Sequence, residues 1–199
     1  MGDDVPRSEL DPESALVLAL RHRLVTELAA AEAALALTRA RSPAKQPLID
    51  RAFDRLSYQL RAERLLANPG TPELGDAARE LCRCIAAYHA EQPAFRLRIV
   101  GRPLVFDDAT MRVLLLVLSE LLNNAATLHA SGRDPIQVSL RTENKVLGIA
   151  IIYRCADNEP QMSETLIDAL RRLIAPCHAS FICQISRGRA MFKVLATLT

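Results

Sequence analysis

The sequence predicts an α+β protein in two parts, a helical hairpin followed by a two-layer α/β sandwich. Two long segments with helical spacing of apolar residues come first, separated by Ser42-Pro43. The pattern changes after Asn68-Pro69-Gly70, where segments that alternate apolar and polar residues are interspersed with further helices. We therefore expect a short polar tail at residues 1–10, a hairpin domain at 11–68 and an α/β domain at 71–199.

The first helix is expected to begin near Asp11-Pro12-Glu13 and to end near Arg41. Asp is a good N-cap, Pro fits the first turn, and an acidic residue there lies at the positive end of the helix dipole. The apolar residues of this helix form one stripe, which predicts a helix that faces the core of a bundle: Leu16, Leu20, Leu24, Leu28, Ala31 and Leu35.

A second helix is expected from about Pro47 to Leu66, ended by the Asn-Pro-Gly break. Two helices of this length joined by a short loop form an antiparallel hairpin. Because such a hairpin buries only one face of each helix, we expect two copies to pair as a homodimer with a four-helix bundle at its centre.

The C-terminal part contains both helical and alternating segments. Helices are expected at residues 71–90, 109–130 and 163–174, and strands at 95–100, 136–140, 146–153, 181–185 and 190–198. Glu143 to Lys145 and Ser186 to Arg189 are expected to be the turns of two hairpins. This order of elements predicts helices packed on one face of a sheet.

The composition excludes several classes of function. The 25 basic and 23 acidic residues are mixed along the chain, so the net charge of +2 provides no concentrated basic field for nucleic acid. Aromatic residues make up 4% of the chain and tryptophan is absent, which disfavours a base-stacking platform and a membrane belt. The longest apolar run, Val113 to Leu118, is far shorter than the ~20 residues that span a bilayer. Because the N-terminus is acidic and polar, we expect a cytoplasmic protein without a membrane segment.

The spacing of the cysteines does not favour a metal site. Five cysteines, an odd number, fit reduced thiols in the cytoplasm. Cys82 and Cys84 form a C-x-C, and Cys177 precedes His178 with Cys183 nearby. On a helix, Cys82 and Cys84 would point about 200° apart, so we expect buried or incidental thiols and no bound metal.

The first helix holds a histidine between two arginines, in LRHRLVT at Leu20 to Thr26. At about 100° per residue, His22 lies roughly 160° from the centre of the leucine stripe, which predicts an imidazole that faces solvent. A neutral imidazole, with an unperturbed pKa of about 6.5, can accept and pass on a phosphoryl group. Thr26 lies one turn further along the same face, and Arg21 and Arg23 could attract an acidic partner or bind phosphate. The alternative is a structural histidine without a chemical role.

The helix expected at 109–130 carries Ser119-Glu-Leu-Leu-Asn-Asn-Ala-Ala126, in which Glu120 and Asn124 are i,i+4 neighbours. This stretch resembles the N-box of sensor histidine kinases, which lies on a helix that lines their ATP site. The resemblance extends to Arg98-Ile-Val-Gly-Arg-Pro103, and LRHRLVT is similar to the phosphoacceptor box of the HWE-type kinases.

This resemblance implies a role for each matching residue. Asn124 would hold Mg²⁺ against the phosphates of ATP, and Glu120 would assist the attacking imidazole, which would be that of His22. Thr26 would position the water that dephosphorylates a receiver aspartate.

The sequence departs from the kinase pattern where ATP would bind. The family has an Asp-x-Gly-x-Gly loop after the strand that matches 146–153, and a later glycine-rich segment that wraps the phosphates. Here no glycine lies between Gly148 and Gly188. We therefore expect a degenerate histidine-kinase ATPase domain that does not bind ATP and holds no cofactor. Its residual nucleotide-site positions are Glu120, Asn124 and Asp157, the last as a remnant of the adenine-binding aspartate.

A chain with the phosphoacceptor hairpin and without the ATP loops resembles a histidine phosphotransferase of a phosphorelay. We expect His22 to carry a phosphoryl group between the aspartates of response-regulator receiver domains, or the protein to dephosphorylate a receiver. Such transfer depends mainly on in-line positioning, with Mg²⁺ supplied by the receiver. Two alternatives stay open, namely a non-catalytic pseudokinase that sequesters a response regulator and an active but atypical histidine kinase.

Overall fold

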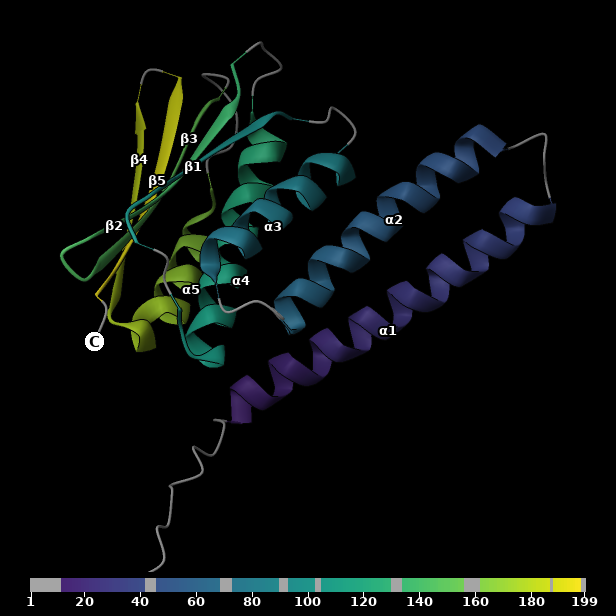
Figure 1. Cartoon of the computed structure of the whole chain (residues 1–199), viewed down its shortest axis with the longest axis horizontal. Helices are drawn as coiled ribbons and strands as arrows, with labels where there is room; N and C mark the ends of the chain where they lie inside the picture. The colour runs from purple at the N-terminus through teal and green to yellow at the C-terminus, as the bar shows by residue number, and fades with distance from the viewer. Residues whose placement is uncertain are drawn as a thin grey trace, which may run out of the picture.

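The computed structural model describes residues 12–41, 46–68, 73–89, 93–102, 105–129, 134–155, 162–186 and 188–197. The helices are α1 (Pro12–Arg41), α2 (Gln46–Ala67), α3 (Leu74–Tyr88), α4 (Asp108–Leu128) and α5 (Glu164–Ile174), with a short 3₁₀ turn η2 (Ala175–Cys177) after α5. The strands are β1 (Phe95–Val100), β2 (Ile136–Glu143), β3 (Val146–Arg154), β4 (Ala179–Ser186) and β5 (Arg189–Thr197). A hairpin of α1 and α2 lies beside an α/β layer that contains the other elements (Figure 1). This order of elements confirms the predicted α+β fold.

The strands form one mixed sheet in the order β1-β2-β3-β5-β4. β1 and β2 are parallel, with Leu97 opposite Val138, and the other neighbours are antiparallel. A parallel pair needs a crossover connection, which α4 provides. The helices α3, α4 and α5 cover one face of the sheet (Figure 1), so the predicted two-layer arrangement is confirmed. In β2 and β3, buried residues alternate with more exposed ones, as expected of strands with one covered face.

α4 is the central helix of the core. It packs against α3, α5 and β3, and its buried side chains are Met111, Leu114, Leu115, Val117, Leu118, Ser119, Leu121, Leu122 and Ala125. Among the described helices, only α4 is long and apolar enough to cross a membrane by length and composition, and half of its most apolar window is buried inside the fold. The position of α4 in the core thus explains why this long helix is apolar.

Local interactions account for several element ends. Asp107 caps α4, its carboxylate accepting a hydrogen bond at 2.9 Å from the N–H three residues on, and Ser163 caps α5 in the same way at 3.2 Å. Asn144 and Lys145 both have positive φ, 48° and 61°, which is the geometry of a two-residue turn between β2 and β3.

Two helix ends differ from the prediction because of long-range pairing. α3 begins at Leu74, whereas a start at residue 71 was predicted. Glu73 is extended, with φ −103° and ψ 117°, and forms an isolated β-bridge with Val105. α4 ends at Leu128, whereas an end at residue 130 was predicted. The next residue, His129, forms a bridge with Cys155. Each bridge removes a residue from helical geometry.

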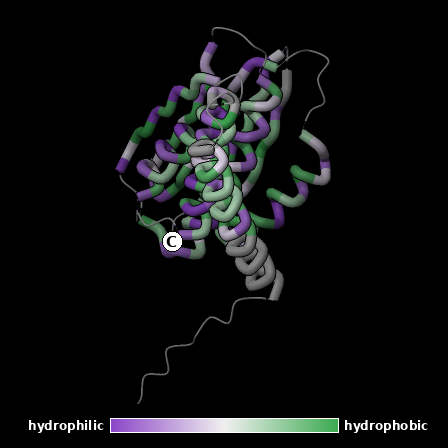
Figure 2. Tube along the Cα trace, turned by 90° about the vertical axis from the view of Figure 1, so that its right-hand side faces the viewer, coloured by the Kyte–Doolittle hydropathy of each residue, from purple (hydrophilic) through white to green (hydrophobic). Residues whose placement is uncertain are grey.

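The hairpin is buried unevenly along its length. In the C-terminal half of α2, Leu60, Ala62 and Leu66 are buried. By contrast, none of the described α1 side chains between residues 24 and 38 is buried. α1 packs chiefly on α2, which lies between α1 and the α/β layer (Figure 1). Figure 2, seen from the side of the hairpin, shows hydrophobic residues on the hairpin helices as well as in the α/β layer.

An ion-pair network joins α2 to α3. Glu80 on α3 pairs with Arg61 on α2 and accepts two hydrogen bonds from Arg83, at 2.8 and 3.1 Å. The hydrogen bonds from Arg83 hold the pKa of Glu80 below its usual value of 4.5. Arg83 also lies over the ring of Tyr58 on α2, with its guanidinium carbon 5.8 Å from the ring centre. The network therefore fixes the hairpin against the α/β layer.

Glu80→Gln is expected to lower the free energy of unfolding by about 0.5–1 kcal/mol at neutral pH, the size of a partly exposed ion pair. Because the folded-state pKa of Glu80 is lowered, its stabilising contribution is present above pH 4.5 and is lost as the pH falls through the lowered pKa. Urea titrations at about pH 7 and about pH 3 measure the difference.

Glu143→Gln is the matched control, because it removes a carboxylate from a more exposed pair, with Arg141 at 2.8 Å. An equal loss of stability in both variants would contradict a special role for the Glu80 network. So would a Glu80→Gln effect of unchanged size at low pH.

Candidate functional site

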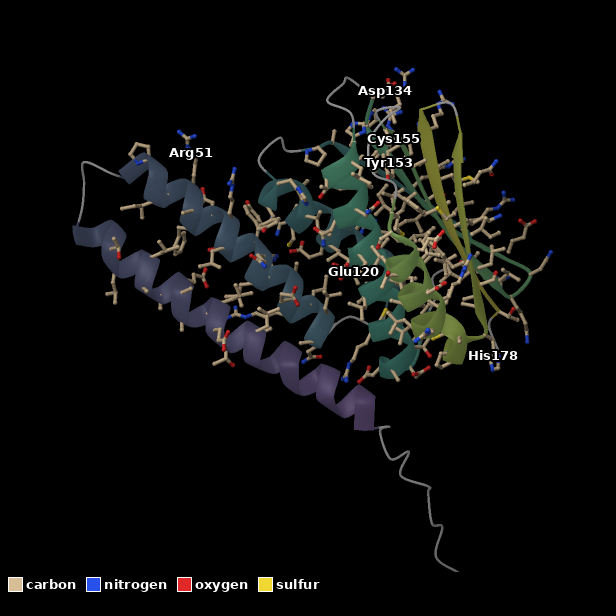
Figure 3. The ribbon with its side chains drawn as sticks, turned by 180° about the vertical axis from the view of Figure 1, so that it is seen from behind. Arg51, Glu120, Asp134, Tyr153, Cys155 and His178 are labelled. Carbon is tan, nitrogen blue, oxygen red and sulfur yellow. The ribbon has the colours of Figure 1, made fainter. Side chains whose placement is uncertain are left out.

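The N-box residues of α4 lie at the edge of the core. Leu121, Leu122 and Ala125 are buried, while Glu120 and Asn124 occupy a half-buried flank of the same helix. Because α4 is continuous through this stretch, the predicted i,i+4 relation between Glu120 and Asn124 is present in the structure. Glu120 is labelled on α4 in Figure 3.

Asn124 is hydrogen-bonded from within the fold. The phenol of Tyr153, near the end of β3, donates to Asn124 Oδ1 at 3.2 Å. The Tyr153 side chain is only 3% exposed, and its ring centre lies 5.9 Å from that of Phe192 on β5. The amide oxygen that the kinase resemblance would assign to Mg²⁺ therefore accepts a hydrogen bond from a buried phenol.

Asn123, the neighbouring asparagine, ties α4 to the end of α3. Its Oδ1 lies 3.3 Å from His89 Nε2, and its side-chain nitrogen donates to Ser119 Oγ at 3.5 Å. The Thr127 hydroxyl donates to the Asn123 carbonyl at 2.9 Å. These contacts give Asn123 a structural role beside Asn124.

Sequence reasoning missed Tyr153 and His89, the two side chains from outside α4 that contact the asparagines. Tyr153 could have been suspected, because it places a phenol at the end of an otherwise aliphatic strand that matches the strand before the kinase adenine loop. Nothing in the sequence around His89 indicates a partner 34 residues away.

The segment where a kinase would bind adenine follows β3. Asp157, predicted as the remnant of the adenine-binding aspartate, lies outside the described residues. The end of β3 is fixed by two contacts before that segment begins. Arg154 pairs with Asp134 at 3.0 Å, and Cys155 forms the bridge with His129.

α1 contains the predicted phosphoacceptor positions. Its backbone is helical from Pro12 to Arg41, so His22 and Thr26 are one helical turn apart. The side chains of Arg21, His22 and Arg23 lie outside the described residues, and Thr26 is exposed. Because α1 packs chiefly on α2, these positions belong to the hairpin, whereas Glu120 and Asn124 belong to the α/β layer.

The C-x-C cysteines are part of the core. Cys82 and Cys84 lie on α3, and burial raises the pKa of the Cys82 thiol to about 12 and that of Cys84 to about 11. Burial therefore disfavours the thiolate form of both cysteines, which is the form that binds metals and acts as a nucleophile. Across the described part of the chain, no three His, Cys, Asp or Glu side chains come together as metal ligands would.

Tyr153→Phe is expected to lower the free energy of unfolding by about 0.5–1.5 kcal/mol, because it removes one hydrogen bond and leaves the ring in place. A double-mutant cycle with Asn124→Ala, followed by urea titration, should give a coupling energy of about 0.5–1.5 kcal/mol. Tyr88→Phe, at a position that is 38% exposed, is the control and should change little. A coupling energy near zero would show that the Tyr153 phenol does not stabilise Asn124.

No protein-family model matches this sequence, and no curated protein matches it. Solved structures, however, match nearly the whole chain. The histidine kinase domain of a blue-light activated histidine kinase from Erythrobacter litoralis is 17% identical, with a TM-score of 0.55 over 94% of this chain and 95% of that one. A bacterial phosphotransferase is 9% identical, with a TM-score of 0.55 over 94% of this chain and 98% of that one.

A longer chain of the Erythrobacter litoralis kinase is 19% identical, with a TM-score of 0.54, and this chain spans 63% of its length. The matches thus include the hairpin as well as the sheet and its covering helices. The chain therefore has the histidine-kinase-like fold that the N-box resemblance predicted.

Proposed function

We propose that the protein is a histidine phosphotransferase of two-component signalling, in which His22 carries a phosphoryl group between the aspartates of receiver domains. Three observations together support this proposal. The fold is histidine-kinase-like, yet its N-box Asn124 is hydrogen-bonded to Tyr153, and no glycine lies between Gly148 and Gly188 to wrap the phosphates of ATP. The likeness to a bacterial phosphotransferase over 94% of the chain supports the same class of function.

The transfer step requires a nucleophile and an in-line approach. A nitrogen of neutral His22 attacks the phosphorus of the receiver's aspartyl phosphate, so that the P–N bond forms as the P–O bond to the aspartate breaks. The aspartate leaves as a carboxylate with the bonding electron pair, and the phosphorylated ring releases the proton of its other nitrogen. Transfer from His22 to the aspartate of a second receiver follows the same steps in reverse. The receiver supplies Mg²⁺, and nucleotide is not required.

Thr26 and the arginines beside His22 have roles at the receiver interface. Thr26 is exposed on α1, one turn from His22. Its hydroxyl orients a water that hydrolyses the receiver's aspartyl phosphate, which gives the protein a second activity as a receiver phosphatase. Arg21 and Arg23 supply positive charge for the acidic phosphorylation site of the receiver.

A homodimer is part of this function, because α1 lacks a covered core face in one chain. None of its described side chains between residues 24 and 38 is buried, and Leu24, which belongs to the predicted leucine stripe, is 38% exposed. Large apolar side chains left in water on a long helix indicate a face that another element covers. A second hairpin packed on α1 completes a four-helix bundle.

Leu24→Glu is expected to convert the dimer into a monomer, because the bundle interior would have to bury an unpaired carboxylate. Size-exclusion chromatography with light scattering should give twice the mass of one chain for the wild type and the mass of one chain for the variant. Ile182→Glu, at an isoleucine of β4 that is 43% exposed, is the control and should stay dimeric. A monomeric wild type would rule out the homodimer.

His22→Ala is expected to abolish phosphoryl transfer to the protein. Receiver domains phosphorylated with labelled acetyl phosphate are mixed with the protein, and acid-labile label on the protein is followed with time. His178→Asn is the matched control, because His178 is an exposed histidine at φ 49°, a conformation that asparagine tolerates.

Three other results would point to other functions. Label taken from ATP alone would favour an atypical histidine kinase. Loss of receiver phosphate without labelling of the protein, abolished by Thr26→Ala, would indicate a receiver phosphatase only. No label from either donor, with receiver binding unchanged in His22→Ala, would favour a pseudokinase that sequesters a response regulator.

A further inference from the structure

A groove lies between the N-terminal half of α2 and the C-terminal end of α3. Its volume is about 760 Å³, which is within the size range of small-molecule pockets. Arg51, Arg55 and Tyr58 line it from α2, and Arg83 and His89 line it from the end of α3. Arg51 projects from α2 on the side away from α1 (Figure 3). The described lining residues include neither Glu120 nor Asn124 of the N-box, so the groove is distinct from the N-box flank of α4.

The α2 wall presents two unpaired cations. Arg51 and Arg55 are one turn apart and exposed, and neither has an ion pair or hydrogen bond with another described residue. Like charges four residues apart slightly destabilise a helix, so this pair of arginines does not stabilise α2. Asp54 adds a single carboxylate to the lining.

The α3 wall is held in place by contacts outside the groove. Arg83 is fixed by its two hydrogen bonds to Glu80 and by its position over Tyr58. His89 is fixed by its contact with Asn123, 3.3 Å between Nε2 and Oδ1. Ala86 and Ala87 complete this wall with small side chains, which leaves room between the two helices.

We infer that this groove binds a small phosphate-bearing ligand, of the size of a nucleotide or less. A guanidinium is a planar fork of donors that matches two oxygens of a phosphate. Arg51 and Arg55 offer two such forks, and no carboxylate of the described residues is paired with either. A ligand at this place contacts the hairpin and the α/β layer together. It also contacts His89, whose partner Asn123 is the neighbour of Asn124 on α4. Binding in this groove does not depend on the proposed phosphoryl transfer by His22.

Pyrophosphate is the probe for this site. It is titrated into the full chain in low-salt buffer by isothermal titration calorimetry, with citrate as a multiply charged anion that lacks phosphorus. We expect saturable binding of pyrophosphate, weakened at least about tenfold in the double variant Arg51→Gln/Arg55→Gln. Arg96→Gln/Arg98→Gln, which removes the same charge from exposed positions on β1, is the control and should bind as the wild type does.

Several results would overturn the inference. Equal weakening by the two double variants would indicate diffuse charge attraction only, and citrate binding as tight as that of pyrophosphate would exclude a preference for phosphate. Weakening by Asn124→Ala and not by the groove variant would place the binding at the N-box. No saturation by about 10 mM pyrophosphate would mean that there is no site. If the double variant does not fold, as judged by circular dichroism, Arg51→Gln alone provides the same test, with an expected loss of about threefold or more.

Discussion

The burial of α4 is the constraint on which the rest of the structure depends. Leu118, Leu121, Leu122 and Ala125 must all face α3 and the sheet, and this requirement fixes the rotation of the helix about its axis. Once that rotation is fixed, the polar residues between them can lie only on the flank. The N-box geometry is therefore a consequence of core packing, and it persists in this fold whether or not a nucleotide binds there.

The same constraint creates a problem for a protein without a ligand at this flank. A half-buried amide such as that of Asn124 costs about 1–3 kcal/mol if it loses water without gaining a partner. The Tyr153 phenol supplies that partner at 3.2 Å, and the packing of its ring on Phe192 holds it there. A kinase would need the amide oxygen for a metal ion, whereas a phosphotransferase that takes phosphate from another protein has no such need. Tyr153 thus reconciles a retained asparagine with the proposed loss of ATP chemistry.

The features that could be predicted from the sequence are those set by neighbours along the chain. The caps at Asp107 and Ser163 and the alternation of β2 and β3 depend on residues a few positions apart, and the helices and strands to which they belong were predicted. The contacts that shape the site join residues 29 and 34 positions apart, and the groove between α2 and α3 exists only because two helices cross. Neither these long-range contacts nor the groove can be predicted from the spacing of apolar residues along the chain. The solvent-facing position of His22 stays a prediction, because its side chain lies outside the described residues.

α2 belongs to both parts of the molecule, and its two halves have different surroundings. Its C-terminal half is anchored by Leu60 and Leu66, which are 1% and 4% exposed, and by the ion pair of Arg61 with Glu80. Among the described residues of its N-terminal half, which lies along α1, no side chain is buried, and Arg51 and Arg55 have no ion pair with another described residue. A ligand or a partner that bound this distal half would add contacts where the chain has fewest, at little cost to the anchored half. The part of the hairpin farthest from the core is therefore where binding can most easily change how the hairpin is held.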